Sequence, residues 1–432
     1  MFRRTFLASG LGLAGALAGC AAPLAPDGRT DPPPTPAVGT DSPPPPPGDA
    51  PLGYTHLRPD GNRLIDGRGS LPRADPVDVG LDAKPEWVVG VPWEDGVRLA
   101  VVTAGGARVL SVVDGDVSVL DHDLDAPPGP PLLVGASEPV LAPVIGSPLT
   151  HAVPTTGGWA SVTPDGAVRL PAGENADVDA LPDARIVRAA GRLCAAGRLY
   201  VLASRTREYA HGVLGDELEA ASIAVLDPAG GLEATLAPPS GVVEGIAPIV
   251  ADVDDDGERE VVVTASDAER GARLVALSAA GDATEGVAVG SGFRWRHQLA
   301  VAPFGPGGET ELAAVKTPHV GGTAEFYRVR DGRLDLVASL RGYSTHAIGS
   351  RTLDNAVAGD LDGDGSMELL VPDDPQRELV GLRRLDGDGG GVVEAWRVPL
   401  GGRLTSNLCA VTGPAGVVVA AGRANALRVW PA

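Results

Sequence analysis

Two short acidic segments carry the residue pattern with the clearest chemical meaning. In each, oxygen-bearing side chains recur at every second position, and a glycine (Gly257 or Gly365) occupies the sixth position. Alternate carboxylates on a tight loop can turn toward one point, and Ca²⁺ takes six to eight oxygen ligands at about 2.3–2.6 Å. The segments therefore predict two calcium sites that brace loops and do not catalyse. The candidate ligands are Asp252, Asp254, Asp256, Glu258 and Glu260 in one segment, and Asp360, Asp362, Asp364, Ser366 and Glu368 in the other, the seventh position contributing its backbone carbonyl.

The pattern does not fit an EF-hand. That motif needs a bidentate Glu at position 12 and a helix after it, whereas Val263 and Val371 occupy those positions inside Val/Leu-rich runs typical of strands. A third segment, residues 303–311, keeps a glycine and the final Glu311 but lacks the other carboxylates, so we expect it to be metal-free. The alternative for the two full segments is an acidic surface turn, and residues 386–389 are interpreted as a plain turn.

The acidic segments belong to a repeating chain of strands. Short β-branched runs alternate with Gly, Asp and Pro turns, and the segments that start at residues 251, 302 and 359 superpose with offsets of 51 and 57 residues. A period near 50 with about four strands per unit is typical of propeller blades. Units starting near residues 86, 138, 186, 245, 295, 345 and 403 predict an all-β, seven-bladed β-propeller, with six or eight blades as alternatives.

Two further elements are expected around this repeat. The last unit is short, and residues 56–79 are predicted to add a strand to it and close the ring. This strand would cover a sheet edge that could otherwise pair with another chain. Residues 208–221 are the one plausible helix, expected as an excursion between strands.

An acidic segment of this spacing followed by a strand resembles the FG-GAP/VCBS repeats of integrin-α-like β-propellers. The resemblance covers most of residues 86–432, although the full acidic motif occurs only twice. It implies Ca²⁺ at the hairpin that joins the first two strands of a blade.

The propeller topology predicts a second polar group at the rim opposite these hairpins. The start of a blade's first strand and the end of its second strand share that rim, where Ser344 and Asn407 occupy comparable places. A pocket there could bind an anionic ligand such as a carboxylated sugar, or a transition metal through imidazoles. The alternative is a polar channel lining held by hydrogen bonds. The candidate residues are Arg296, His297, Lys316, His319, His346 and Arg351.

The first residues resemble a bacterial export signal that ends in a lipid-attachment site. Arg3 and Arg4, followed by Thr, Phe and Leu, resemble the twin-arginine signal, and residues 17–20 (Leu-Ala-Gly-Cys) resemble a lipobox. We therefore expect residues 1–19 to be a signal peptide and Cys20 to carry the lipid that holds the protein at a membrane. The alternative is an ordinary secretory signal with an incidental cysteine.

Composition bounds the rest of the chain. Residues 20–52 are expected to be a disordered linker, because residues 23–52 hold twelve prolines, and residues 53–432 are expected to form the propeller. The formal net charge of −21 argues against nucleic-acid binding. No second run of apolar residues is long enough to span a membrane. Cys194 and Cys409 are predicted to be buried free thiols, with a disulfide as the alternative.

These observations predict a calcium-braced, membrane-anchored monomer of the cell envelope that faces the periplasm or the exterior. Its predicted function is to bind an unknown glycan or protein. The alternatives are a polysaccharide lyase or hydrolase that uses the His/Arg/Lys rim, and a scaffold or assembly factor. The aromatic content of six Trp, five Tyr and five Phe is low for a sugar-binding protein, which weakens both glycan hypotheses. No zinc-protease pair, CxxC pair or nucleophile elbow is present.

Overall fold

The computed structural model describes residues 46 and 48–432, except 172, 174, 192–193, 210, 213–216, 320 and 386–389. Residues 41–432 group into one compact unit. The predicted signal peptide, Cys20 and nearly all of the linker lie outside the described residues, as does the predicted turn at 386–389. The first strand begins at Leu52, one residue before the predicted start of the propeller.

Every element among the described residues is a β-strand, and within that part of the chain no helix of membrane-spanning length and hydropathy occurs. The helix expected over residues 208–221 is therefore wrong where the structure describes it. Residues 208 and 209 form a turn, and Glu219 and Ala220 already belong to a strand that pairs with Arg205 and Thr206. The helix-forming residues of this stretch are overridden by strand pairing, as tertiary context often does.

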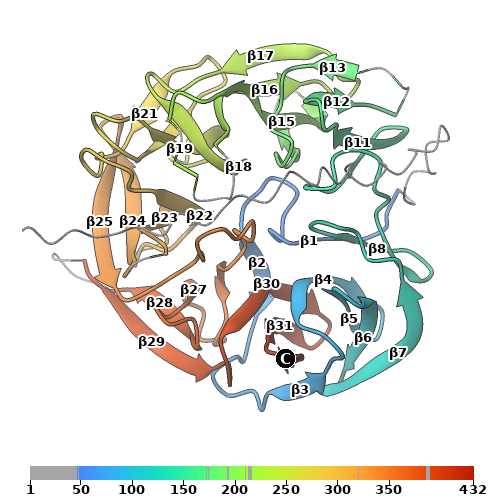
Figure 1. Ribbon diagram of the computed structural model, residues 1–432. Helices are drawn as coiled ribbons and strands as arrows, with labels where there is room; N and C mark the ends of the chain where they lie inside the picture. The colour runs from blue at the N-terminus through green and yellow to red at the C-terminus, as the bar shows by residue number, and fades with distance from the viewer. Residues whose placement is uncertain are drawn as a thin grey trace, which may run out of the picture. The chain divides into compact units, whose positions relative to one another are not determined.

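The strands form antiparallel meanders in chain order, and Figure 1 shows the meanders following one another around a ring. The described chain is thus a β-propeller. The first meander consists of β4 (Pro85–Trp93), β5 (Gly96–Thr103), β6 (Gly106–Val113) and β7 (Asp116–Leu124). The second consists of β10 (Val153–Thr155), β11 (Gly158–Val162), β12 (Ala167–Arg169) and β13 (Asn175–Asp177).

The next two meanders are joined into one sheet by a single pairing between Ala220 and Val243. One of them consists of β14 (Val187–Gly191), β15 (Cys194–Thr206), β16 (Glu219–Leu226) and β17 (Leu232–Leu236). The other consists of β18 (Val242–Ala251), β19 (Glu260–Ser266), β20 (Arg273–Leu277) and β21 (Ala283–Glu285).

Three meanders complete the ring. The first is β22 (Arg296–Ala302), β23 (Glu311–Lys316), β24 (Thr323–Arg330) and β25 (Arg333–Arg341). The second is β26 (Val357–Asp360), β27 (Glu368–Pro372), β28 (Glu378–Arg384) and β29 (Val392–Pro399). The third is β30 (Leu404–Gly413), β31 (Gly416–Arg423) and β32 (Ala426–Trp430). Five predicted units begin within a few residues of the first residue of a meander, namely that of β4, β14, β18, β22 or β30. The other two predicted starts lie further from the first residues of β10 and β26.

The N-terminal part of the domain completes this arrangement. β3 (Val77–Gly80) pairs with β32, which confirms the strand predicted to extend the last unit. β2 (Leu64–Arg68) pairs in parallel with β26. β1 (Leu52–Tyr54) forms a small sheet with β8 (Leu132–Gly135) and β9 (Pro139–Leu141), which the repeat count did not include. The number of blades therefore stays a prediction.

Residues 59–63, between β1 and β2, cross the middle of the ring and bond to several of its sheets (Figure 1). The Pro59 carbonyl accepts from the Arg188 amide at 2.6 Å, and the Asp60 carbonyl accepts from the Val250 amide at 2.9 Å. Asn62 exchanges hydrogen bonds of 2.8 and 3.0 Å with the backbone of Val301. We call residues 54–63 the axial segment. Sequence analysis did not predict it.

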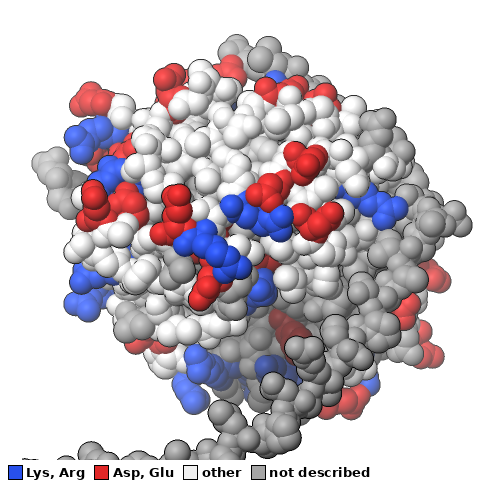
Figure 2. Space-filling view, turned by 45° about the horizontal axis from the view of Figure 1, so that its top comes forward, with Lys and Arg blue, Asp and Glu red and all other residues white. Residues whose placement is uncertain are grey.

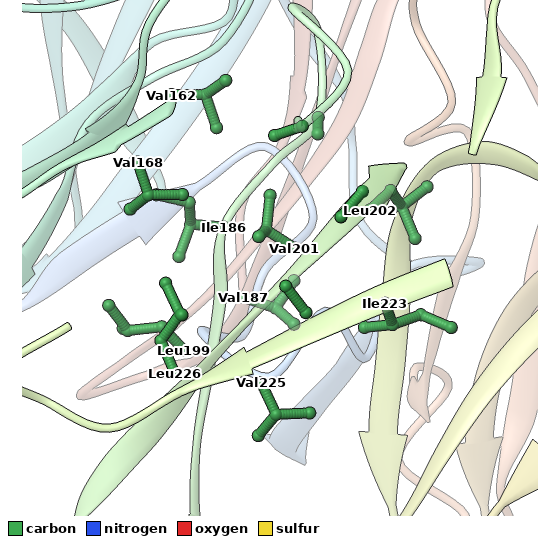
Figure 3. Packing of buried hydrophobic residues seen from close by; sticks show 14 of the residues in the cluster. Val162, Val168, Ile186, Val187, Leu199, Val201, Leu202, Ile223, Val225 and Leu226 are labelled. Carbon is green, nitrogen blue, oxygen red and sulfur yellow. The ribbon is translucent and has the colours of Figure 1, made fainter. Parts of the chain in front are cut away.

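Apolar side chains between neighbouring sheets hold the ring together. Figure 3 shows Val162, Val168, Ile186, Val201 and Leu226 pointing toward one another from neighbouring meanders, and each is at most 1% exposed. Burying such side chains stabilises the fold by about 1.5–3 kcal/mol each. Tight turns set the strand order within a sheet.

Turn chemistry explains the hairpins locally. Asp114 and Gly115, and likewise Asp331 and Gly332, have positive φ angles of 49° and 86°, and 49° and 70°. Two-residue turns with both φ values positive match the right-handed twist of the strands that they join, and Asp-Gly is a favoured sequence for them.

Candidate metal sites and buried charge clusters

The first acidic segment forms the hairpin between β18 and β19, as predicted. One carboxylate oxygen from each of Asp252, Asp254 and Glu260 lies within 4.8 Å of the other two. Backbone amides hold the loop: Gly257 donates to Asp252 at 2.9 Å, and Val253 donates to Glu260 at 3.0 Å. The loop thus gathers three carboxylates without a neighbouring cation from the protein.

The second acidic segment repeats this arrangement between β26 and β27. Asp360, Asp362 and Glu368 each bring one carboxylate oxygen within 4.8 Å of the others. The Gly365 amide donates to Asp360 at 3.1 Å, and the Leu361 amide donates to Glu368 at 2.9 Å. Two loops 108 positions apart in the sequence therefore share one hydrogen-bond pattern.

The other predicted ligands shape the loops. The Asp256 carboxylate accepts from the Glu258 amide at 2.7 Å, and the Asp364 carboxylate accepts from the Ser366 amide at 2.8 Å. Asp364 also pairs with Arg383. Among the described residues, these four do not join the groups of three carboxylates.

The donor chemistry of both loops fits a hard divalent cation. Asp252 Oδ1, Asp360 Oδ1 and Glu368 Oε1 are buried and accept no hydrogen bond. Burial raises the pKa of Glu260 to about 7 and that of Glu368 to about 8, and the neighbouring aspartates add to the shift. Buried carboxylates without donors are costly, and a calcium ion bound by all three would remove that cost.

In the third hairpin, between β22 and β23, arginine side chains and not a metal site neutralise the buried glutamate. Pro303, Gly305 and Gly307 stand where the acidic loops have aspartates. Glu311 corresponds to Glu260 and Glu368 and is fully buried. Arg384 Nε lies 2.9 Å from Glu311 Oε2.

A second arginine completes this pairing. Arg328 Nη2 lies 2.5 Å from Glu311 Oε1, and its Nη1 lies 2.9 Å from Glu309 Oε1. Both oxygens of Glu311 therefore face guanidinium groups, which leaves no place for a metal ion beside them. This agrees with the expected absence of the metal-binding pattern from this loop.

The cationic rim residues form ion pairs with acidic side chains. Arg296 pairs with Glu325 at 2.8 Å, and Lys316 pairs with the other oxygen of Glu325 at 3.0 Å. Tyr327 donates to the same carboxylate at 2.7 Å. Arg351 pairs with Asp183. Sequence analysis found the cations but missed these acidic partners, which lie on a neighbouring strand or a distant blade.

The rim histidines gather around one tryptophan. The His297 ring stacks on Trp295 at 4.9 Å between centroids, and His346 meets the same indole edge-on at 5.3 Å. His319 lies 6.0 Å from His346. Among the described residues, only the acidic loops form metal-ligating groups of three. Two of the imidazoles pack against Trp295 and the third against His346, and the three do not form the transition-metal site that was one of the expected possibilities.

His297 and His346 are buried, and their lowered pKa values keep both rings neutral. Burial lowers the pKa of His346 to about 4, and it lowers that of His297 well below its usual range, with Arg63 adding to the shift. His346 Nε2 lies 2.8 Å from the Ser350 carbonyl, and His297 Nδ1 lies 3.1 Å from Thr345 Oγ1. These contacts match the hydrogen-bonded polar lining that the sequence left as the alternative.

A carboxylate–histidine pair was missed by sequence analysis. His211 Nδ1 lies 2.6 Å from Glu244 Oε1, and Ser266 donates to the second oxygen of that carboxylate. A carboxylate only accepts, so Nδ1 of His211 donates the hydrogen bond to Glu244. The His211 ring also stacks on Phe293 at 5.1 Å.

A second missed group lies on the axis. Arg63 and Arg185 both pair with Asp354, at 3.0 and 2.6 Å, and all three side chains are at most 7% exposed. His56 stacks on His151 beside them at 5.7 Å. The rule that located Arg296 and Arg351, polar residues just before a blade's first strand, also applies to Arg185 and Asp354, so a consistent search would have found them.

Surface charges are mixed. Figure 2 shows red and blue side chains next to one another on the face turned forward, with no continuous blue patch there. Ion pairs such as Arg205 with Asp179 at 2.5 Å and Arg270 with Glu285 at 3.4 Å show the same pattern. Such exposed pairs contribute at most about 1 kcal/mol each. The single cysteine whose side chain is described, Cys409, is a buried free thiol, as predicted.

The similar solved structures are distant, with low sequence identity and TM-scores below 0.5. No protein-family model matches the chain, and no curated protein matches it. A quinohemoprotein alcohol dehydrogenase from Comamonas testosteroni is 11% identical over 87% of this chain and 79% of that one, with a TM-score of 0.47. A gluconolactonase from Xanthomonas campestris is 15% identical over 90% and 98%, with a TM-score of 0.34. An exotype rhamnogalacturonan lyase is 14% identical over 83% and 72%, with a TM-score of 0.32. At these identities, no activity carries over to this chain.

Proposed function

We propose that this chain is a calcium-braced β-propeller of the FG-GAP/VCBS type that is tethered in the bacterial cell envelope and binds a glycan or protein through the rim opposite the acidic hairpins. The calcium part is supported by the buried carboxylate oxygens of Asp252, Asp360 and Glu368 that accept no hydrogen bond. In this proposal the ions stiffen two hairpins and take no part in recognition.

One observation carries the binding role. Phe293 and Ile348 are 60% and 70% exposed, and they lie on the loops that lead into β22 and β26, two neighbouring inner strands. Both loops therefore belong to the rim opposite the acidic hairpins. Large exposed apolar side chains on adjacent loops are typical of interaction sites. Lys316, 36% exposed beside them, adds a polar group for orientation.

The binding role can be tested with the chain from residue 46 onward and the isolated cell envelope of the source bacterium. We expect Phe293→Ala combined with Ile348→Asp to reduce sedimentation with the envelope at least tenfold. Leu232→Asp is the matched control, because Leu232 is 56% exposed on the outer strand β17, away from this rim. Equal loss in both variants, or loss in neither, would refute a rim-specific site.

The tether is a separate part of the proposal. It rests on the twin-arginine and lipobox patterns that end at Cys20. A clickable fatty-acid label should enter the wild-type protein and not Cys20→Ala, and the variant should leave the membrane fraction. Substituting both Arg3 and Arg4 by Lys should retain the protein in the cytoplasm. Labelling of Cys20→Ala would contradict the assignment.

One observation favours the alternative of a polysaccharide lyase. Glu244 orients His211 so that Nε2 can accept a proton, and Phe293 stacks on its ring at an exposed place. A base in that position could remove the proton next to the carboxylate of an acidic sugar. Ultraviolet absorbance of unsaturated products from uronate polysaccharides would reveal the activity, and His211→Gln should abolish it. No product from a broad panel would leave the binding role as the function.

A further inference from the structure

We propose that the propeller axis holds one small carboxylate-type anion, bound by the free edge of Arg185 and covered by the axial segment. The site lies away from the acidic hairpins, and its side chains are buried, unlike the exposed Phe293 and Ile348 of the rim. It is formed by residues from the loop before β14, the loop before β10 and the axial segment itself. No part of the proposed binding function uses these residues.

The geometry around Asp354 defines the site. Asp354 Oδ1 accepts from Arg63 Nη2 at 3.0 Å, and Oδ2 accepts from Arg185 Nη1 at 2.6 Å. Arg63 Nη1 lies 3.1 Å from the Leu299 carbonyl. Arg185, in contrast, uses only Nη1. Its Nε and Nη2 are buried and have no partner, although the side chain is 1% exposed.

Two histidines add further polar atoms without partners. Both nitrogens of His56 and Nε2 of His151 are buried and unpartnered, and each residue is at most 5% exposed. Burial lowers the pKa of both imidazoles, and Arg185 lowers it further, which places both rings near that guanidinium. His151 Nδ1 donates to the Ala152 carbonyl at 3.2 Å, so Nε2 of the neutral ring carries no hydrogen. The neutral His56 ring can still donate one N–H beside Arg185.

The charges do not balance without a ligand. Two guanidinium groups face one carboxylate, so the cluster carries one net positive charge in the interior. The charged groups that act on Arg63 are Asp354 and Arg185, and those that act on His56 are Arg185, Asp354 and Arg63, together with the neutral His151. An uncompensated buried charge is strongly destabilising, and each unpaired buried donor destabilises the fold further. One monovalent anion removes both costs.

The free atoms of Arg185 select the shape of that anion. Nε and Nη2 form one edge of the planar guanidinium, and their two parallel N–H bonds match the two oxygens of a carboxylate. A halide can meet both donors but gains nothing from their planar spacing. The site is therefore assigned to a small carboxylate, for which formate is the simplest probe.

The axial segment makes this an enclosed site. Tyr54 lies 5.1 Å from His56 between ring centroids and is 3% exposed. The segment is fixed by backbone bonds from Pro59 and Asp60 to two neighbouring meanders. An anion below it cannot leave without local opening, so we expect slow exchange and retention during purification.

Two measurements on the wild-type full chain test the proposal. Denatured protein should release about one equivalent of a small carboxylate, measured by ion chromatography. Protein refolded from urea with ¹³C-formate should show one bound formate resonance distinct from the free one, and it should persist in a large excess of sodium chloride. Absence of both the released carboxylate and the bound resonance overturns the proposal, as does displacement of formate by chloride.

Variants assign the site to Arg185. Arg185→Lys keeps the charge but loses the planar edge, and it should take up formate at least about tenfold more weakly. Arg273→Lys is the matched control, because Arg273 is also 1% exposed but all its nitrogens have partners in Asp267, Glu285 and Ser240. Equal uptake by Arg185→Lys and the wild type would refute the assignment. If Arg185→Lys does not fold, His56→Phe, which removes the imidazole whose two nitrogens have no partner, takes its place with the same expected loss.

Discussion

The acidic hairpins and the hairpin at residues 303–311 occupy the same place in their blades and neutralise the same glutamate differently. Glu260, Glu311 and Glu368 each begin the second strand of a meander, and each is at most 8% exposed. At Glu311, two guanidinium groups face the carboxylate. At the other two positions, aspartates gather around it instead. The blades keep the glutamate and differ in the groups around it, and we propose that calcium takes the place of the guanidinium groups in the acidic hairpins.

This difference shows what the hairpin requires. A buried carboxylate at the start of an inner strand must be paired, because an isolated one costs several kcal/mol. A divalent ion satisfies it with ligands from one loop of nine residues. In the arginine-paired hairpin, one partner of the buried carboxylate is Arg384, which comes from the neighbouring blade. This ion pair therefore also links two blades. The following predictions test that comparison.

Calcium removal should have the largest effect, and only through the acidic hairpins. Each site should contribute about 2.7 kcal/mol when free calcium is 100 times the Kd, or about 5 kcal/mol for two independent sites. Chelator should therefore lower the melting temperature strongly, and Asp254→Ala combined with Asp362→Ala should remove that effect. Glu309→Gln, a carboxylate change in the arginine-paired hairpin, is the matched control and should keep it. An unchanged melting curve with chelator would count against structural calcium.

Removing an arginine should damage the third hairpin whether or not calcium is present. Arg384→Met keeps an unbranched apolar side chain but loses the guanidinium that lies over Phe326 at 6.0 Å, and it leaves one oxygen of Glu311 without its partner. Breaking a buried pair typically costs about 3–5 kcal/mol, and we expect the low end because Arg328 remains. Urea unfolding measures this cost. Adding Glu311→Gln to Arg384→Met should restore part of it, and failure to do so would mean that lost packing, not charge, explains the effect.

Acid should weaken the protein outside both kinds of hairpin. His346 has a folded-state pKa of about 4, lowered mainly by burial, against about 6.5 when unfolded. Between these values the unfolded chain binds a proton that the folded chain does not, so the free energy of unfolding falls as the pH falls. The expected slope is about 1.4 kcal/mol per pH unit.

His346→Gln isolates this contribution. Glutamine can still donate to the Ser350 carbonyl but does not titrate. The free energy of unfolding, measured by urea at several pH values with calcium present, should fall less steeply in the variant. The acidic hairpins respond to pH as well, because calcium needs deprotonated ligands, but the difference between the two proteins cancels that response. Parallel pH profiles would contradict a buried neutral His346.

The sequence predicted what is local and missed what depends on distant partners. The meanders and the loops at 252–260 and 360–368 follow from periodicity and spacing within about fifty residues. The strand that β3 adds to β32 joins distant positions and was predicted only because the last unit is short. Arg384 reaches Glu311 across 73 positions, and Arg185 reaches Asp354 across 169. The axial segment is harder still, because nothing in residues 54–63 shows that they cross the ring. The backbone groups to which these residues hydrogen-bond come together only in the closed ring.

The smallest predicted effect tests whether the two kinds of hairpin act independently. Thr310, in the arginine-paired hairpin, donates to Asp255 of the first acidic hairpin at 2.6 Å, and both groups are exposed. Because Asp255 is not among the gathered carboxylates, Thr310→Val should cost about 0.5 kcal/mol, the low end for a net hydrogen bond. The cost should be equal with calcium and with chelator. A double-mutant cycle with Asp362→Ala, in the other acidic hairpin, should show no coupling, because these sites share no partner. A larger cost in calcium would mean that the ion-bound loop braces its arginine-paired neighbour, and the two solutions to the buried glutamate would then be one connected structure.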